Sequence, residues 1–144
     1  MSLERHARFH TEAATIPAFP GAYLLVIDLD RPVTAGVVAK RDALLAPGRY
    51  VYCGSAKGPG GLQARVACHM RRGKSVRWHI DRLTEQGRVV GAWVFPDGTE
   101  CDLVAALSGW PIPVPGFGSS DCRTCASHLL AWPEGMELPW AMAG

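Results

Sequence analysis

The sequence predicts a single α/β (α+β) domain in which helices pack on a small, central, mostly antiparallel sheet. The chain has 144 residues, of which 48% are hydrophobic, and this suffices for one domain with a modest core. Short apolar, β-rich runs alternate with turn residues. Segments with helical spacing of apolar residues are bounded by glycine. Together these observations predict one mixed domain of strands and helices.

The expected strands are residues 23–29, 33–40, 49–55 and 88–95, with a further short element at 127–132. The first run is apolar and ends at the turn residues 30–32. We expect the second strand to pair with the first through this turn. Residues 46–48, Ala-Pro-Gly, break the chain before the third strand. Alternation in that strand places Tyr50, Tyr52 and Gly54 on one face.

Three helices are expected, at residues 60–73, 75–86 and 100–107. Glycine punctuates the ends of the first two, at Gly60, Gly73 and Gly87. Asp97 or Thr99 can cap the third. Residues 1–20 are expected to form a loosely ordered leader with a short helical piece, residues 21–132 the domain, and residues 133–144 a C-terminal tail.

Positive charge is concentrated in one part of the chain. The net charge is only +2, but residues 55–80 contain no acidic residue. The basic residues of this segment are Lys57, Arg65, Arg71, Arg72, Lys74 and Arg77. Such an excess attracts phosphate chains, although a solvated helix face explains it equally well.

The sequence also predicts a compartment. It shows no secretory signal and no uninterrupted apolar run long enough for a bilayer, so we expect a cytoplasmic protein without a membrane partner. The five cysteines are an odd number. Reduced thiols or a metal site are therefore favoured over a disulfide framework.

Two tyrosines and a basic helix carry the candidate chemistry. Tyr23 opens the first strand and Tyr52 lies in the third, with Tyr50 as a competitor on the same face. Arg65 and His69 are four residues apart, which places them on one stripe of the first helix. A phenol has a pKa of about 10 and is a poor base unless cations lower that value. An arginine can donate two hydrogen bonds to a phosphate. Together these groups suit cleavage of a phosphodiester.

Five motifs in order resemble the GIY-YIG nuclease superfamily. They are Gly21-Ala22-Tyr23, Tyr52-Cys53-Gly54-Ser55-Ala56, Gly58-Pro59-Gly60-Gly61-Leu62, Trp78-His79-Ile80-Asp81 and Phe117-Gly118-Ser119-Ser120-Asp121-Cys122. The closer similarity is to an uncharacterised branch that is sometimes fused to archaeal endonuclease III. The resemblance extends over about residues 21–129. It implies a GIY-YIG-like fold and a DNA endonuclease acting in DNA repair, on damaged or branched DNA.

The resemblance also implies roles for particular residues. Tyr23, Tyr52, Arg65 and His69 match the catalytic positions, with Tyr23 or Tyr52 as the base. Glu100 matches the carboxylate that holds one Mg²⁺ or Mn²⁺ ion. We expect both hydroxyls, the guanidinium and this carboxylate to line one open, positively charged groove. The DNA contacts are assigned to Lys57, Gly60, Gly61, Arg71, Arg72, Lys74 and Arg77, and the N–H groups of the 58–61 turn are expected to bind phosphate.

A second cluster has the spacing of metal ligands. Cys122, Cys125 and His128 could hold a structural Zn²⁺, with Asp121 or Cys101 as the fourth ligand. The sequence favours reduced cysteines and a hydrogen-bonded histidine instead. Two alternatives to the nuclease therefore stay open: a non-catalytic nucleic-acid-binding module and a zinc-stabilised interaction domain.

Overall fold

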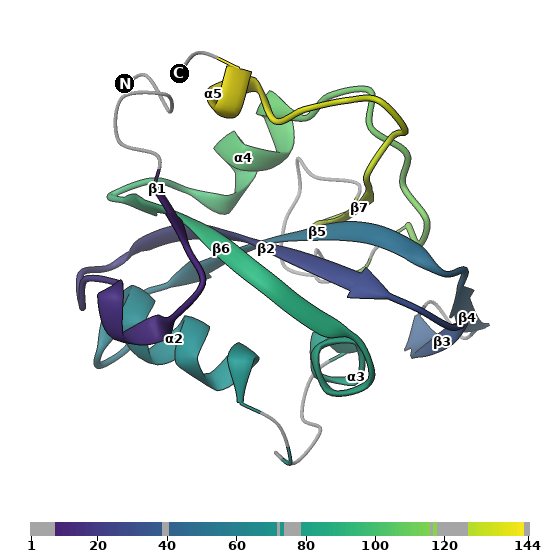
Figure 1. Cartoon of the computed structure of the whole chain (residues 1–144), viewed down its shortest axis with the longest axis horizontal. Helices are drawn as coiled ribbons and strands as arrows, with labels where there is room; N and C mark the ends of the chain where they lie inside the picture. The colour runs from purple at the N-terminus through teal and green to yellow at the C-terminus, as the bar shows by residue number, and fades with distance from the viewer. Residues whose placement is uncertain are drawn as a thin grey trace.

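A five-stranded antiparallel sheet forms the centre of the protein, with strand order β1-β6-β2-β5-β7 (Figure 1). The computed structural model describes residues 8–38, 41–71, 73, 79–115, 117 and 127–142. The strands of this sheet are β1 (Arg8–His10), β2 (Gly21–Leu29), β5 (Gly48–Ala56), β6 (Arg88–Pro96) and β7 (Leu129–Ala131). This confirms the predicted α+β class and the mostly antiparallel sheet.

Helices cover both faces of the sheet (Figure 1). On one face lie α2 (Gly61–Met70) and α3 (His79–Gln86), and on the other lie α4 (Glu100–Ala106) and α5 (Pro139–Met142). A 3-10 turn, η1 (Ala13–Thr15), packs beside α2. None of the helices in the described ranges is long and apolar enough to cross a membrane.

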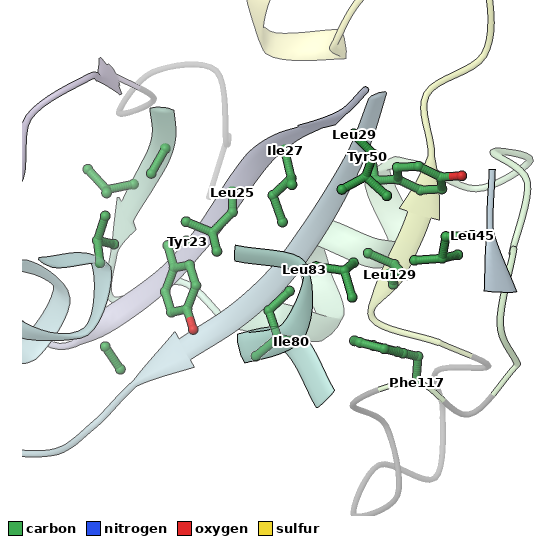
Figure 2. Packing of buried hydrophobic residues seen from close by; sticks show 14 of the residues in the cluster. Tyr23, Leu25, Ile27, Leu29, Leu45, Tyr50, Ile80, Leu83, Phe117 and Leu129 are labelled. Carbon is green, nitrogen blue, oxygen red and sulfur yellow. The ribbon is translucent and has the colours of Figure 1, made fainter. Parts of the chain in front are cut away.

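The central strand β2 is buried on both of its faces, which explains its uninterrupted apolar sequence. Tyr23, Leu25 and Ile27 contribute to a core cluster with residues of α2 and α3. Leu24 and Val26 contribute to a second cluster with residues of α4 and α5. The period-two alternation of the strand therefore divides the protein into two cores. Figure 2 shows the first core, in which Tyr23 and Tyr50 lie well apart, with Leu25 and Ile27 between them.

The predicted pairing of residues 33–40 with the first strand is wrong. β3 (Val33–Val38) pairs instead with β4 (Arg41–Leu45), a strand that the sequence analysis did not predict, in a separate two-stranded sheet. The reason lies in β2, whose two edges are already occupied along almost their full length by β5 and β6. β2 therefore has no free edge with which β3 could pair.

The part of the predicted leader that the structure describes belongs to the fold. β1 pairs with β6, and Ile16 is buried in the first core. The carbonyl of Phe19 accepts a hydrogen bond from the N–H of Leu62 (2.9 Å). A Cβ at Gly61 would collide with the carbonyls of Ala18 and Phe19. The chain before β2 is thus held closely against the start of α2.

Candidate functional site

The two motif tyrosines lie on neighbouring strands of the α2 face. Tyr23 of β2 is directly opposite Gly54 of β5, and Tyr52 is two pairs further along, opposite Leu25 and on the same face. The phenol ring of Tyr23 lies over the Cα of Gly54, so that a Cβ there would overlap the Tyr23 hydroxyl and ring. Glycine at position 54 is therefore required for the ring of Tyr23 to occupy this place.

A buried hydrogen bond joins Tyr23 to His69. The hydroxyl lies 2.8 Å from Nε2, and each residue is only 1% exposed. Burial raises the pKa of Tyr23, as do the nearby Tyr52 and, more weakly, Glu100, whereas the charge and a hydrogen bond of Arg65 act in the opposite direction. The hydroxyl of Tyr23 and Nε2 of His69 share one hydrogen bond, and the tautomer of the histidine ring sets which of them donates. The predicted stripe of Arg65 and His69 thus does face Tyr23.

Tyr52 is more accessible than Tyr23. Its side chain is partly exposed, and its ring lies edge-on to His69, with the ring centroids 6.3 Å apart. Burial raises the pKa of Tyr52 to about 12, and Glu100 adds to this effect while Arg65 opposes it. Both Tyr52 and Tyr23 are therefore protonated at neutral pH in the protein alone.

Glu100 reaches the same place from the other face of the sheet. It is the first residue of α4, whose N-cap Thr99 accepts a hydrogen bond from the N–H of Asp102 (3.2 Å). α4 begins shortly after β6 ends at Pro96, and Pro96 pairs with Gly21 at the start of β2. The carboxylate is close enough for its charge to raise the pKa of both phenols. The structure thus brings together all five residues that the sequence assigned to catalysis and metal binding.

The expectation of one open groove lined by both phenols is not met. The side chains of Tyr23 and His69 are buried between α2 and the sheet, whereas those of Tyr52, Arg65 and Glu100 are partly exposed. Tyr52 is therefore the motif phenol that can approach a substrate, and Tyr23 can act only through its neighbours. Tyr50 no longer competes for this role. It points to the other end of the core and donates a hydrogen bond to the carbonyl of Ala46 (2.7 Å).

A basic cavity of about 360 Å³ adjoins the site. It lies between the turn after β5 and α2, and Lys57 and Arg65 are its charged lining residues, with Cys68 beside them. Gly60 and Gly61 have φ of 82° and 54°, the left-handed region in which glycine is favoured. The turn therefore places two cations at a concave surface of the size that accepts a phosphate group.

The expected phosphate-binding amides at the start of α2 are already engaged. The N–H of Gly61 donates to Gly58 (3.1 Å), that of Leu62 to Phe19 (2.9 Å) and that of Gln63 to Pro17 (3.2 Å). The prediction that this helix start offers free N–H donors is wrong at these positions, because the preceding chain folds back and supplies carbonyl acceptors. These three N–H groups therefore offer no donor to a ligand of the cavity.

Several other predicted residues cannot be placed at the site. Arg71 is exposed at the end of α2. Arg72, Lys74 and Arg77 lie outside the described residues, as do Cys122 and Cys125. His128 is buried, and its N–H donates to the carbonyl of Phe117 (2.9 Å). The described ranges contain no group of three or more His, Cys, Asp or Glu residues arranged to hold a metal.

The sequence analysis assigned no role to one acidic residue near Tyr52, although that residue belongs to the fourth motif. Asp81 of α3 is only 3% exposed, and its charge contributes to the raised pKa of Tyr52. Its signal was available in the sequence. Asp81 and Thr84 are three residues apart on the buried side of α3, next to the apolar stripe of Ile80 and Leu83.

The fold and the site define an α+β domain in which a buried tyrosine–histidine pair, an arginine and a carboxylate meet around one end of an antiparallel sheet. The sequence matches the family described as domain of unknown function DUF123 over residues 22–142. The chain belongs to this family. No curated protein and no solved structure matches the chain.

Proposed function

We propose that this protein is a DNA endonuclease of the GIY-YIG type that hydrolyses phosphodiester bonds with the help of one Mg²⁺ or Mn²⁺ ion. The observation that carries the proposal is the hydrogen bond of 2.8 Å between Tyr23 and His69, with Arg65 and Glu100 acting on the same phenol. These groups come from β2, α2 and α4, and titratable groups that are buried in contact, with a charged neighbour, are typical of functional sites.

Each group has a part in the proposed hydrolysis. Tyr52 is the accessible phenol. Once its own hydroxyl has lost its proton, the Tyr52 oxygen accepts a proton from the attacking water. Arg65 binds the phosphate and offsets the negative charge that develops on its oxygens. Tyr23 and His69 are positioning residues. Tyr23 interacts with Arg65, and the His69 ring packs against the ring of Tyr52. Lys57 binds a phosphate next to the scissile one, in the cavity that it shares with Arg65.

Glu100 fits the role of the metal carboxylate. A single partly exposed carboxylate suits a hard ion that keeps several of its waters and takes further oxygens from the phosphate. Without an ion, Glu100 raises the pKa of both phenols. An ion held there would supply positive charge, reverse the sign of this effect and lower the pKa of Tyr52. The raised pKa values of the protein alone are therefore compatible with a base that works only when a divalent cation is present.

The test is a nicking assay on supercoiled DNA and on nicked, flapped, branched and abasic duplexes, with Mg²⁺ or Mn²⁺. We expect metal-dependent cleavage by the wild type and a loss of about 100-fold or more in Glu100→Gln, Tyr52→Phe and Arg65→Ala. Tyr50→Phe removes a phenol hydroxyl at the other end of the same core, and Glu134→Gln removes an exposed carboxylate, so both controls should keep full activity. Equal activity of Glu100→Gln and wild type would contradict the proposal.

The pH profile tests the role of Tyr52 separately. A base with a raised pKa is mostly protonated at neutral pH, so its active fraction grows about tenfold per pH unit until the pKa is reached. We expect the wild-type cleavage rate to rise between about pH 6 and 9 and then to reach a plateau. Of Mg²⁺ and Mn²⁺, the ion that lowers the pKa of Tyr52 more should give the plateau at the lower pH. The profile of Arg65→Lys should keep this slope. A flat wild-type profile would exclude Tyr52 as the base.

The cavity of Lys57 and Arg65 favours a second candidate, a nucleic-acid-binding module without cleavage. Such a module would bind DNA with an affinity that falls as salt rises, and Lys57→Ala would weaken it, whereas Glu100→Gln would leave binding unchanged and no metal would produce nicks. In either case we place the protein in the cytoplasm, with DNA as its partner.

A further inference from the structure

A second concave surface lies on the α4 and α5 face of the sheet, which does not carry Tyr23 and Tyr52. This groove has a volume of about 360 Å³, and the residues that matter here are Phe9, Arg49, Trp93, Trp132, Glu137 and Leu138. Phe9 is 40% exposed, although it contacts Trp93 with ring centroids 5.3 Å apart. An open groove with three aromatic side chains is a common feature of binding surfaces.

The two charged lining residues of the groove, Arg49 and Glu137, differ in their ion pairs. Arg49 makes a two-point ion pair with Asp28, with distances of 2.7 and 3.0 Å, and its guanidinium lies 5.6 Å from the ring centroid of Trp132. Glu137 is exposed and takes part in no ion pair within the described part of the chain. Glu137 is thus the acidic lining residue that is available to a ligand. A basic group of the ligand would be attracted to its carboxylate.

The backbone around the groove further restricts the ligand. The groove lies on the face of the sheet, over the central strand β2, whose two edges are occupied by β5 and β6. A peptide that lies across this face therefore gains no ladder with β2. A polyproline II segment keeps its backbone solvated and binds through its rings and apolar side chains, which is the mode that aromatic-lined grooves recognise.

We propose that this groove binds an extended, proline-rich peptide segment of a partner protein, and that a basic residue of the segment pairs with Glu137. Phe9, Trp93 and Trp132 contact the proline and leucine side chains. This function is independent of the proposed nuclease, because the groove contains none of the residues Tyr52, Arg65 and Glu100.

The test uses two synthetic peptides of alternating proline and leucine that differ at one position, arginine in the first and glutamate in the second. Binding is followed by tryptophan fluorescence, since Trp93 and Trp132 line the groove. We expect the arginine peptide to bind at least about fivefold more tightly than the glutamate peptide. Glu137→Lys should reverse this order, and Glu134→Lys, an exposed charge outside the groove, should not. Phe9→Ala should weaken the binding of both peptides.

Four outcomes would overturn this proposal. They are failure of both peptides to bind, equal affinity for the two, quenching by single-stranded oligothymidine that Phe9→Ala abolishes, and a concentration-dependent dimer that Glu137→Lys dissociates. The last two would identify a nucleobase or a second copy of the chain as the occupant. DNA nicking by Glu137→Lys should equal that of the wild type, so failure of this proposal is distinguishable from failure of the nuclease.

Discussion

Gly54 is the residue on which the buried phenol depends most directly. A methyl group added there would overlap the Tyr23 ring and hydroxyl. The ring cannot move away without losing its bond of 2.8 Å to His69. The smallest possible substitution at this position therefore disturbs the centre of the site.

We expect Gly54→Ala to lower the free energy of unfolding by about 1–3 kcal/mol, the usual cost of overpacking. Urea denaturation followed by fluorescence measures it. Gly58→Ala is the matched control, because a Cβ at Gly58 meets nothing within 4 Å. A change in Gly54→Ala no larger than in Gly58→Ala would show that the Tyr23 ring moves freely.

Much of the site could be predicted at the level of single residues. Spacing placed Arg65 and His69 on one side of a helix, and the motif order selected Tyr23 and Tyr52. The uninterrupted apolar run of residues 23–29 is typical of a buried strand, and Tyr23 is buried accordingly. Alternation gives the face of a strand and not the partner of each side chain, so the sequence did not reveal that the Tyr23 hydroxyl lies outside an open groove and that Tyr50 is engaged by Ala46.

At the scale of elements, an ion-pair cluster fastens the ends of three neighbouring strands. Asp28 of β2 accepts hydrogen bonds from Arg49 of β5 (2.7 Å) and from Arg88 of β6 (3.2 Å). The hydrogen bond from Arg49 lowers the pKa of Asp28, partly offset by burial. Stability contributed by a carboxyl with a depressed pKa is present above its unfolded pKa of about 3.9 and is lost as the pH falls through the folded pKa.

We expect Asp28→Asn to lower the free energy of unfolding at pH 7 by about 0.5–1 kcal/mol, because the side chains are 29–67% exposed and solvent screens the pair. The difference from the wild type should vanish at about pH 2. Urea unfolding at both pH values measures it. Asp30→Asn, an exposed carboxyl, should have no such effect, and a difference that persists in acid would assign the loss to packing.

The long strands, the helices at 61–70, 79–86 and 100–106 and the short element at 129–131 were predicted from the sequence, whereas the strands β1 and β4 were not. β2, β5, β6 and α4 are apolar or capped segments with clear signals. β1 has three residues, Arg8–His10, and exists only because β6 offers it an edge. β4 begins with the charged residues Arg41 and Asp42, and it forms a strand because it pairs with β3. Pairing between distant segments determines such elements, and local sequence does not encode it.

At the scale of the whole molecule, the C-terminal segment closes the second core. Trp140 is 4% exposed, and its ring centroid lies 5.1 Å from that of Phe95 and 6.1 Å from that of Trp93. Leu138 is buried in the same cluster. Residues 133–144 were predicted to be a tail, but the part up to residue 142 that the structure describes includes core residues.

We expect Trp140→Ala to lower the free energy of unfolding by about 3–5 kcal/mol, because it leaves a large cavity between β6 and α5. Thermal and urea unfolding measure the loss. Met136→Ala, at a side chain that is 48% exposed, should change stability by less than about 0.5 kcal/mol. A loss below about 1 kcal/mol in Trp140→Ala would mean that the second core is complete without this segment.

The pairing of β1 with β6 has a practical consequence for anyone who expresses this protein. A recombinant fragment trimmed to the family boundary at residue 22 would lack β1 and the chain that contacts the start of α2. Residues 92–94 of β6 would then lose their pairing partner, and Trp93 its contact with Phe9. Strands left open in this way recruit other molecules, and such a fragment would precipitate where the longer chain stays in solution.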